Sequence, residues 1–289
     1  MYKFRYAAIT HQGNVRAKNE DNFYIDGKWK RDEDENYCQT VGSAENRLLA
    51  AVCDGMGGRA KGERASFLAV ETMEEYEQYI KEKKVPEFQK DPMTYVNEAN
   101  IRICKEIKKQ GTAMGSTLSV LEFVSDFVTA GNLGDSRIYQ MRDNILSQLS
   151  KDHTVVARMV RMGQITPEEA DTHPMRHRIT QHLGIEPEDM ILEPAMAGPI
   201  KIKTNDKYLI CSDGLTDMVG DYEIAEILNE ETALKGVAEN LVQHALAAGG
   251  KDNVTVILIE VREKDSGIEE KVSGGNIIKN IAEKLFGKE

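Results

Sequence analysis

The sequence lacks the features that mark membrane, secreted or nucleic-acid-binding proteins. No apolar run approaches the length of a membrane span, and the N-terminal stretch MYKFRYAAIT is not a signal peptide. The cysteines form no CxxC pair and are widely spaced: Cys38, Cys53, Cys104 and Cys211. We therefore expect reduced thiols in a cytoplasmic protein. Positive charge is scarce as well, since 37 Lys and Arg face 48 Asp and Glu, a net charge of -11 that argues against nucleic acid as the main ligand.

What the sequence does contain fits one large soluble domain with a tail. Of its 289 residues, 40% are apolar and 29% are charged, as in globular proteins with a real core. We expect residues 1–262 to form the domain. Residues 263–289 read as a polar linker followed by a short amphipathic helix, in which Ile277, Ile281 and Leu285 share one face.

Hydrophobic periodicity predicts a chain of the α+β class. Helices are expected at 60–84, 92–109, 221–229 and 232–247, and strands at 3–10, 47–53, 190–196, 207–211 and 254–261, with a meander of four strands over 116–149. Residues 27–46 read as an exposed hairpin or loop, and residues 150–187 as a surface flap with two short helices at most. Because strand blocks and helix pairs are segregated, antiparallel sheets covered by helices are favoured.

Acidic residues recur at the ends of the predicted strands. They are Glu20, Asp21, Asp54, Asp135, Asp213, Asp217 and Asp252. Each one alone is explained as a turn or helix-cap residue. Carboxylates gathered at sheet ends, however, repel one another and lose hydration unless cations join them. Oxygen ligands suit Mg²⁺ or Mn²⁺, and no Cys/His set suggests zinc, so the pattern predicts a site for hard divalent ions without naming a reaction.

Seven short motifs, in order, resemble those of the type 2C metal-dependent protein phosphatases (the PPM family). They are RAKNEDNF at 16–23, DGMGG at 54–58, GST at 115–117, GDSRIY at 134–139, SKDHT at 150–154, CSDGLTD at 211–217 and KDNVTVI at 251–257. The matching part covers roughly residues 5–261. DGMGG resembles the bacterial branch, because many eukaryotic members have His in place of Met56.

This resemblance implies a four-layer α/β/β/α sandwich, two antiparallel sheets flanked by helix pairs, with two Mn or Mg ions at one end. Asp54 would bridge both ions, and the Gly55 carbonyl would bind one of them. The other implied roles are Asp213 and Asp252 on the second ion, Glu20 and Asp21 acting mainly through metal-bound waters, Asp135 and Asp217 at a third, weaker ion, and Arg16 on the substrate phosphate.

The implied reaction is hydrolysis of phosphoserine and phosphothreonine on proteins by a water that two metal ions activate. Ser136 and Ser212 are then structural, not nucleophiles. Met56 cannot donate a proton. The candidate donors in or near the flap are His153, His173, His177 and His182, none of which is favoured over a structural role. The flap is expected to select substrates by contacting the peptide beside the phosphate.

Three other functions are considered. A phosphatase-fold binding module without turnover is disfavoured because every expected metal position keeps a carboxylate. A dedicated partner-switching phosphatase, acting on a phosphorylated anti-sigma-factor antagonist, shares the chemistry and stays open beside a broad phosphatase that opposes a Ser/Thr kinase. A metal-dependent nuclease is opposed by the acidic composition. We expect a monomer.

Overall fold

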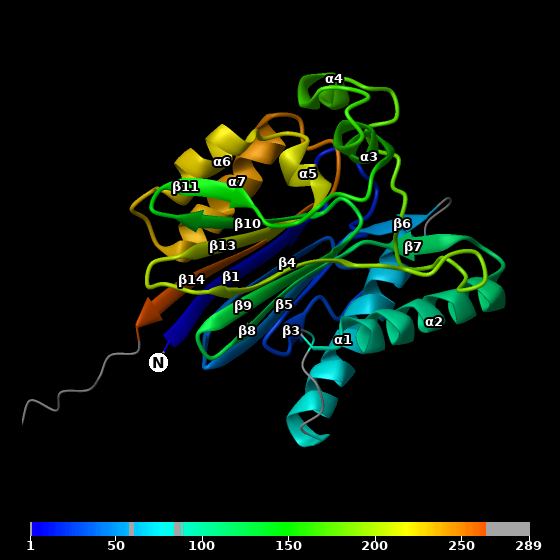
Figure 1. The fold of residues 1–289 in the computed structure, drawn as a ribbon, viewed down its shortest axis with the longest axis horizontal. Helices are drawn as coiled ribbons and strands as arrows, with labels where there is room; N and C mark the ends of the chain where they lie inside the picture. The colour runs from blue at the N-terminus through cyan, green and yellow to red at the C-terminus, as the bar shows by residue number, and fades with distance from the viewer. Residues whose placement is uncertain (1, 58–60, 84–87, 89, 264–289) are drawn as a thin grey trace, which may run out of the picture.

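Two six-stranded antiparallel sheets pack face to face in the computed structural model, which describes residues 2–57, 61–83, 88 and 90–263 (Figure 1). The first sheet has the order β11 (Ile145–Gln148), β10 (Arg137–Arg142), β13 (Lys207–Cys211), β14 (Val254–Glu263), β1 (Tyr2–His11) and β4 (Tyr37–Glu45). The second has the order β12 (Ala195–Lys201), β9 (Phe127–Leu133), β8 (Leu118–Val124), β5 (Arg47–Cys53), β2 (Asn22–Ile25) and β3 (Lys28–Trp29). A short ribbon joins β6 (Gly55–Gly57) to β7 (Met114–Ser116).

Helices cover the outer face of each sheet, which confirms the expected four-layer sandwich (Figure 1). The second sheet carries α1 (Gly62–Lys83) and α2 (Pro92–Gln110), and the first carries α5 (Asp213–Thr216), α6 (Asp221–Leu228) and α7 (Leu234–Ala247). Sequence sets the ends of α2 directly, because Asp91 caps its first turn before a proline and Gly111 adopts the left-handed conformation after its last. The flap helices α3 (Val155–Arg161) and α4 (Pro167–Asp171) project from one end of the sandwich.

Burial on both faces explains the continuous apolar strands. Along β5, Leu48, Ala50 and Val52 face the core between the sheets. The alternate residues Leu49, Ala51 and Cys53 pack against α1 and α2. Such strands read as unbroken apolar runs because neither face meets water. β13 follows the same rule and ends at Cys211, which is fully buried like Cys53 at the end of β5.

Two predictions about strands were wrong in detail. Residues 37–45, expected in a hairpin or loop, form β4, which pairs along its length with β1. β4 is polar because it is an edge strand with half-exposed residues. The strand predicted at 190–196 is instead β12 at 195–201, and its Pro199 is tolerated because β12 also lies at a sheet edge.

The predicted four-strand meander over 116–149 is divided between the sheets. β8 and β9 belong to the second sheet, whereas β10 and β11 belong to the first. Three residues, 134–136, connect Leu133 to Arg137. That is enough chain to cross between packed sheets, since sheets lie about 10 Å apart and an extended residue spans about 3.3 Å. The crossing places Asp135 between the sheets at their end.

Within the described residues, no helix is long and apolar enough to cross a membrane. All four cysteines are free thiols. The flap has the two short helices that were predicted. The expected C-terminal amphipathic helix falls in residues 264–289, which lie outside the described part.

Candidate metal centre

Strand register brings the predicted carboxylates to one end of the sandwich. In the second sheet, Asn22 pairs with Cys53, so Asp21 and Asp54 flank the same edge. In the first sheet, Cys211 pairs with Val256 of β14, so Asp213 and Asp252 also lie beyond the paired strands at this end. Asp135 joins them from the crossing between β9 and β10. The sequence-distant motifs therefore meet because antiparallel neighbours end together.

A pocket of about 660 Å³ opens at this end. The predicted site residues that line it are Arg16, Glu20, Asp54, Gly55, Asp135, Asp213, Asp217 and Asp252. Asp21 lies beneath it, 1% exposed, where Oδ2 accepts hydrogen bonds of 2.7 Å from the hydroxyls of Ser212 and Thr255. The structure thus gathers all nine predicted residues, eight around the pocket and Asp21 under its floor.

Buried hydroxyls hold the carboxylate loops in place. The Asp54 N–H donates to Thr117 Oγ1 and the Thr117 N–H donates back to the Asp54 carbonyl, each at 2.9 Å. Thr117 Oγ1 also lies 2.8 Å from Ser136 Oγ, which links the Asp54 loop to the Asp135 turn. Ser136 and Ser212 are both fully buried, in agreement with their predicted structural role.

Electrostatic repulsion in the pocket is only partly relieved by the protein. Burial raises the pKa of Asp54 well above its usual range, and the charges of Asp21 and Asp213 raise it further. Burial likewise raises the pKa of Asp213, with Asp135 as the next cause. The pKa of Asp135 rises to about 7, mainly through burial and then through the charge of Asp152.

Unpartnered oxygens mark where a cation fits. Oδ1 of Asp21, of Asp135 and of Asp213 are each buried without a hydrogen-bond partner among the described residues. Buried acceptors are normally paired, and leaving one unpaired costs about 1–3 kcal/mol or more for a charged group. These donors are all oxygens, they carry charge of the same sign, and some of them lack a hydrogen-bond partner. Such a set fits hard divalent ions.

Glycine at position 55 lets the backbones of neighbouring site loops approach closely. A side chain on Gly55 would meet the carbonyl oxygens of Gly62 at 2.1 Å and of Glu20 at 2.4 Å. The Gly62 N–H donates to Glu20 Oε1 at 3.2 Å. Burial raises the Glu20 pKa, with the charge of Glu63 as the next cause. Residues 54–57 and the Glu20 loop therefore fit together only because residue 55 is a glycine.

Arg16 reaches the pocket from the loop after β1. Its Nη2 donates to Oδ2 of Asp252 at 2.5 Å, and this hydrogen bond is the largest cause of its raised pKa. Asp252 therefore holds one nitrogen of the guanidinium. The side chain is still 51% exposed and lines the pocket. A planar donor in this position suits a phosphate.

Asn253 is a positioning residue that sequence reasoning missed. Its Oδ1 accepts from the Glu20 N–H at 2.8 Å, and its Nδ2 donates to the carbonyls of Gln12 and Lys18 at 2.7 and 2.8 Å. It thereby ties the loop that carries Arg16 and Glu20 to the start of β14. Its place in KDNVTV, directly after an acidic residue and before a buried strand, was the available signal.

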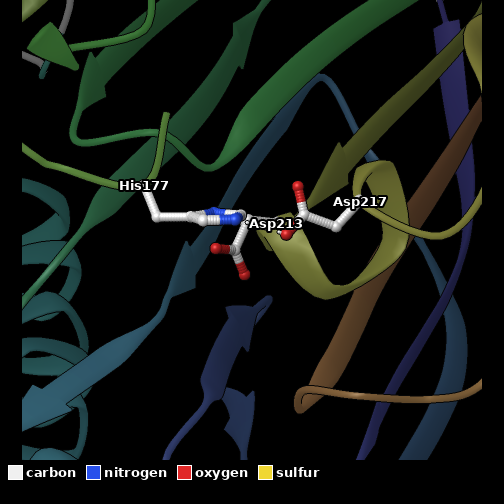
Figure 2. A group of neighbouring side chains, drawn as sticks. All are labelled: His177, Asp213 and Asp217. Atoms are coloured by element: carbon white, nitrogen blue, oxygen red, sulfur yellow. Dashed lines mark ion pairs between the residues drawn. The ribbon is translucent and has the colours of Figure 1, made fainter. Parts of the chain in front are cut away.

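The flap histidines take different places. His153 is 9% exposed, its N–H donates to the Gly134 carbonyl at 2.8 Å, and its carbonyl accepts from Thr180, so it anchors the base of the flap. His182 Nδ1 lies 2.8 Å from the Leu183 carbonyl. His177 alone of the four is grouped with acidic residues: Nδ1 lies 3.4 Å from Oδ2 of Asp217, and Asp213 completes the group (Figure 2).

Fold and site together define a two-sheet α+β sandwich with a candidate divalent-cation centre between its strand ends. A family model described as protein phosphatase 2C matches residues 31–249. The serine/threonine protein phosphatase PstP of Mycobacterium tuberculosis is 34% identical over 278 residues, which are 94% of this chain and 48% of PstP. The chain therefore spans about half the length of that relative.

Two further matches cover nearly whole proteins or domains. The serine/threonine phosphatase stp of Listeria monocytogenes is 32% identical over 267 residues, 87% of this chain and 93% of stp. A crystal structure of the catalytic domain of PstP in complex with two manganese ions superposes with a TM-score of 0.71 at 32% identity, covering 91% of this chain and all of that one. The chain belongs to the protein phosphatase 2C family.

Proposed function

We propose that this chain is a metal-dependent phosphatase that hydrolyses phosphoserine and phosphothreonine on proteins. The observation that carries the proposal is the set of buried, unpartnered carboxylate oxygens around a pocket that Arg16 also lines. Its relatives support the substrate class, because PstP and stp are named serine/threonine phosphatases. We further propose that it opposes a Ser/Thr kinase in the cytoplasm, which its free thiols suit.

The residues proposed to hold the cations are those predicted from the sequence. Asp54, the Gly55 carbonyl, Asp213 and Asp252 would bind two ions, which is the number of manganese ions in the PstP complex. Glu20 and Asp21 would act through water, and Asp135 and Asp217 would hold a third, weaker ion. When bound, such ions supply positive charge to the phosphoryl oxygens and lower the pKa of water from 15.7 to about 7.

This chain's own groups bind and orient the substrate. The guanidinium of Arg16, fixed at one nitrogen by Asp252, presents planar donors to phosphoryl oxygens. Ser212 and Thr255 hold Asp21 beneath the floor, and Thr117 fixes the backbone of Asp54. Covalent catalysis is not proposed, because Ser136 and Ser212, the serines that adjoin Asp135 and Asp213 in sequence, are fully buried and hydrogen-bonded.

The proposed domain is residues 1–262, because β14 closes the first sheet between β13 and β1. A binding module without turnover is not favoured, since each acidic position of the centre is retained and faces or underlies the pocket. A partner-switching phosphatase would use the same centre and differ only in substrate.

Hydrolysis of a phosphothreonine peptide tests the proposal. We expect turnover with Mn²⁺ and none with EDTA. Asp54→Asn should lower kcat at least about 100-fold, as expected for loss of a group that helps to stabilise the charge of the transition state. Asp143→Asn is the matched control, because Asp143 is exposed in the β10–β11 turn and Asn tolerates its positive φ. Turnover that survives chelation, or that Asp54→Asn leaves intact, contradicts the proposal.

A further inference from the structure

The flap sends one histidine into the acidic pocket. His177 lies in the loop after α4, and Figure 2 shows its ring directed at Asp213 and Asp217, at the two ends of α5. Each of the three side chains offers one ligand atom, and these atoms lie within 4.8 Å of one another. We propose that His177 is a nitrogen ligand of the third, weaker cation, called the outer cation from here on, which it would hold together with Asp213 and Asp217 beside Asp135.

A second observation points to a cation at this place. Asp135 lines the same pocket, is only 8% exposed, and its Oδ1 has no hydrogen-bond partner among the described residues. Oδ1 of Asp213 is likewise buried and unpartnered. Ligand capacity is therefore unused on the side of the pocket that the imidazole faces. The inference rests on the metal centre proposed above, and adds a nitrogen to what the sequence predicted as an oxygen-only set.

Spacing within the group suits one ion. Asp213 and Asp217 stand four residues apart across a single helical turn, so their side chains share a face. Neighbouring ligands of an octahedral ion with bonds of about 2.1 Å lie about 3 Å apart. The 3.4 Å between His177 Nδ1 and Asp217 Oδ2 requires a shift of only tenths of an ångström to meet that value.

Arg176 competes for the same imidazole. Its Nε donates to Nε2 of His177 at 2.7 Å, so Nε2 accepts and the ring proton of the neutral imidazole is on Nδ1, the nitrogen that faces Asp217. A cation that binds Nδ1 moves that proton to Nε2, which then cannot accept from Arg176. Cation binding and the Arg176 hydrogen bond are therefore mutually exclusive, and removing the Arg176 side chain strengthens the outer site.

Two consequences follow from a flap ligand. Imidazole favours transition-metal ions, whereas carboxylates alone suit Mg²⁺, so His177 shifts the outer position toward Mn²⁺. His177 also lines a second, neighbouring pocket of about 850 Å³ between the flap helices and α5, together with Arg161 and Arg176. The cation therefore fixes the flap wall of this second pocket against the sandwich.

Pulsed EPR of the whole chain with bound Mn²⁺ tests the nitrogen ligand directly. We expect modulation from an imidazole ¹⁴N in the wild type, its loss in His177→Gln, and its persistence in His182→Gln, a histidine that lines the same pocket. Equilibrium dialysis should show that His177→Gln weakens the weakest Mn²⁺ site more than about tenfold while the tighter sites are kept. Arg176→Met should tighten that weakest site.

The outcomes separate this inference from the proposed function. Mn²⁺ binding without ¹⁴N modulation, or modulation that survives His177→Gln, overturns the role of His177 and leaves the phosphatase proposal standing. A wild-type chain that binds no Mn²⁺ overturns the metal centre itself. Retention of the tighter sites in His177→Gln shows that the variant is folded.

Discussion

One strand, β13, has an acidic residue beyond each of its ends, and the two are treated in opposite ways. Before the strand, Asp206 is 2% exposed and fully compensated. Arg142 binds both of its oxygens, at 2.8 and 2.5 Å, and the Lys203 N–H and the Tyr208 hydroxyl also donate to it. After the strand, Asp213 faces other carboxylates, and its Oδ1 has no partner among the described residues.

The difference teaches how to read a buried carboxylate. When the chain supplies an arginine and further donors, the carboxylate acts in folding, and removing one partner of such a pair is costly. When the chain surrounds a carboxylate with more negative charge, compensation is left to something that binds. The same strand thus joins a structural ion pair at one end of the sandwich to a ligand site at the other.

The sharpest way to break this comparison is Asp213→Asn. We expect phosphopeptide turnover to fall at least about 10³-fold, equivalent to about 4 kcal/mol of transition-state stabilisation. The metal-free protein should be at least as stable as the wild type, because the substitution removes a charge that Asp135 repels. Thermal unfolding in EDTA and kinetics with Mn²⁺ measure the two effects. A variant that is both active and destabilised would refute the assignment.

Asp206→Asn tests the other end and should give the reverse pattern. It breaks a buried pair with Arg142, for which about 3 kcal/mol of unfolding free energy is expected. For a domain of this size, each kcal/mol lowers Tm by about 2–4 °C. Specific activity below the transition should stay within about twofold of the wild type. Lost turnover at unchanged Tm would show that the two ends are not independent.

The sequence predicted the strands that are buried on both faces. β5 and β13 are apolar on both faces, so their bounds at 47–53 and 207–211 were predicted correctly. β4 and β12 were misread because edge strands are polar on one side and tolerate proline. The assignment of β10 to the first sheet could not be predicted, since a three-residue turn fits both a hairpin and a crossing between sheets.

Some residues of the site could likewise be predicted from the sequence and others could not. Asp54 and Asp213 could be singled out because they lie one and two residues beyond a buried strand, and the structure brings both to the pocket. Asp21 was expected to act through metal-bound water; the structure places it under the floor of the pocket, where Ser212 donates to its Oδ2, a contact between residues far apart in sequence. The partners of Asn253 and His177 are residues far away in sequence, so the motif around Asn253 and the flap position of His177 could mark them as candidates but could not show what they contact.

Arg16→Lys tests the comparison between the two ends of the sandwich with the smallest expected effect. The guanidinium of Arg16 both donates to Asp252 and faces the pocket. At the other end of the sandwich, the guanidinium of Arg142 donates to Asp206 and to a backbone carbonyl. A lysine ammonium keeps the charge but not the planar pair of donors. We expect kcat/KM for a phosphothreonine peptide to fall about tenfold, or about 1.4 kcal/mol, mainly through KM and with Mn²⁺ affinity retained.

Arg178→Lys, in the flap wall of the same pocket, is the matched control and should leave kcat/KM within about twofold. If both variants lost the same activity, the pocket would be sensing positive charge in general, and the geometric role of Arg16 would be wrong. If neither lost activity, phosphate binding would belong to the cations alone. Only a loss confined to residue 16 fits a planar donor anchored by Asp252.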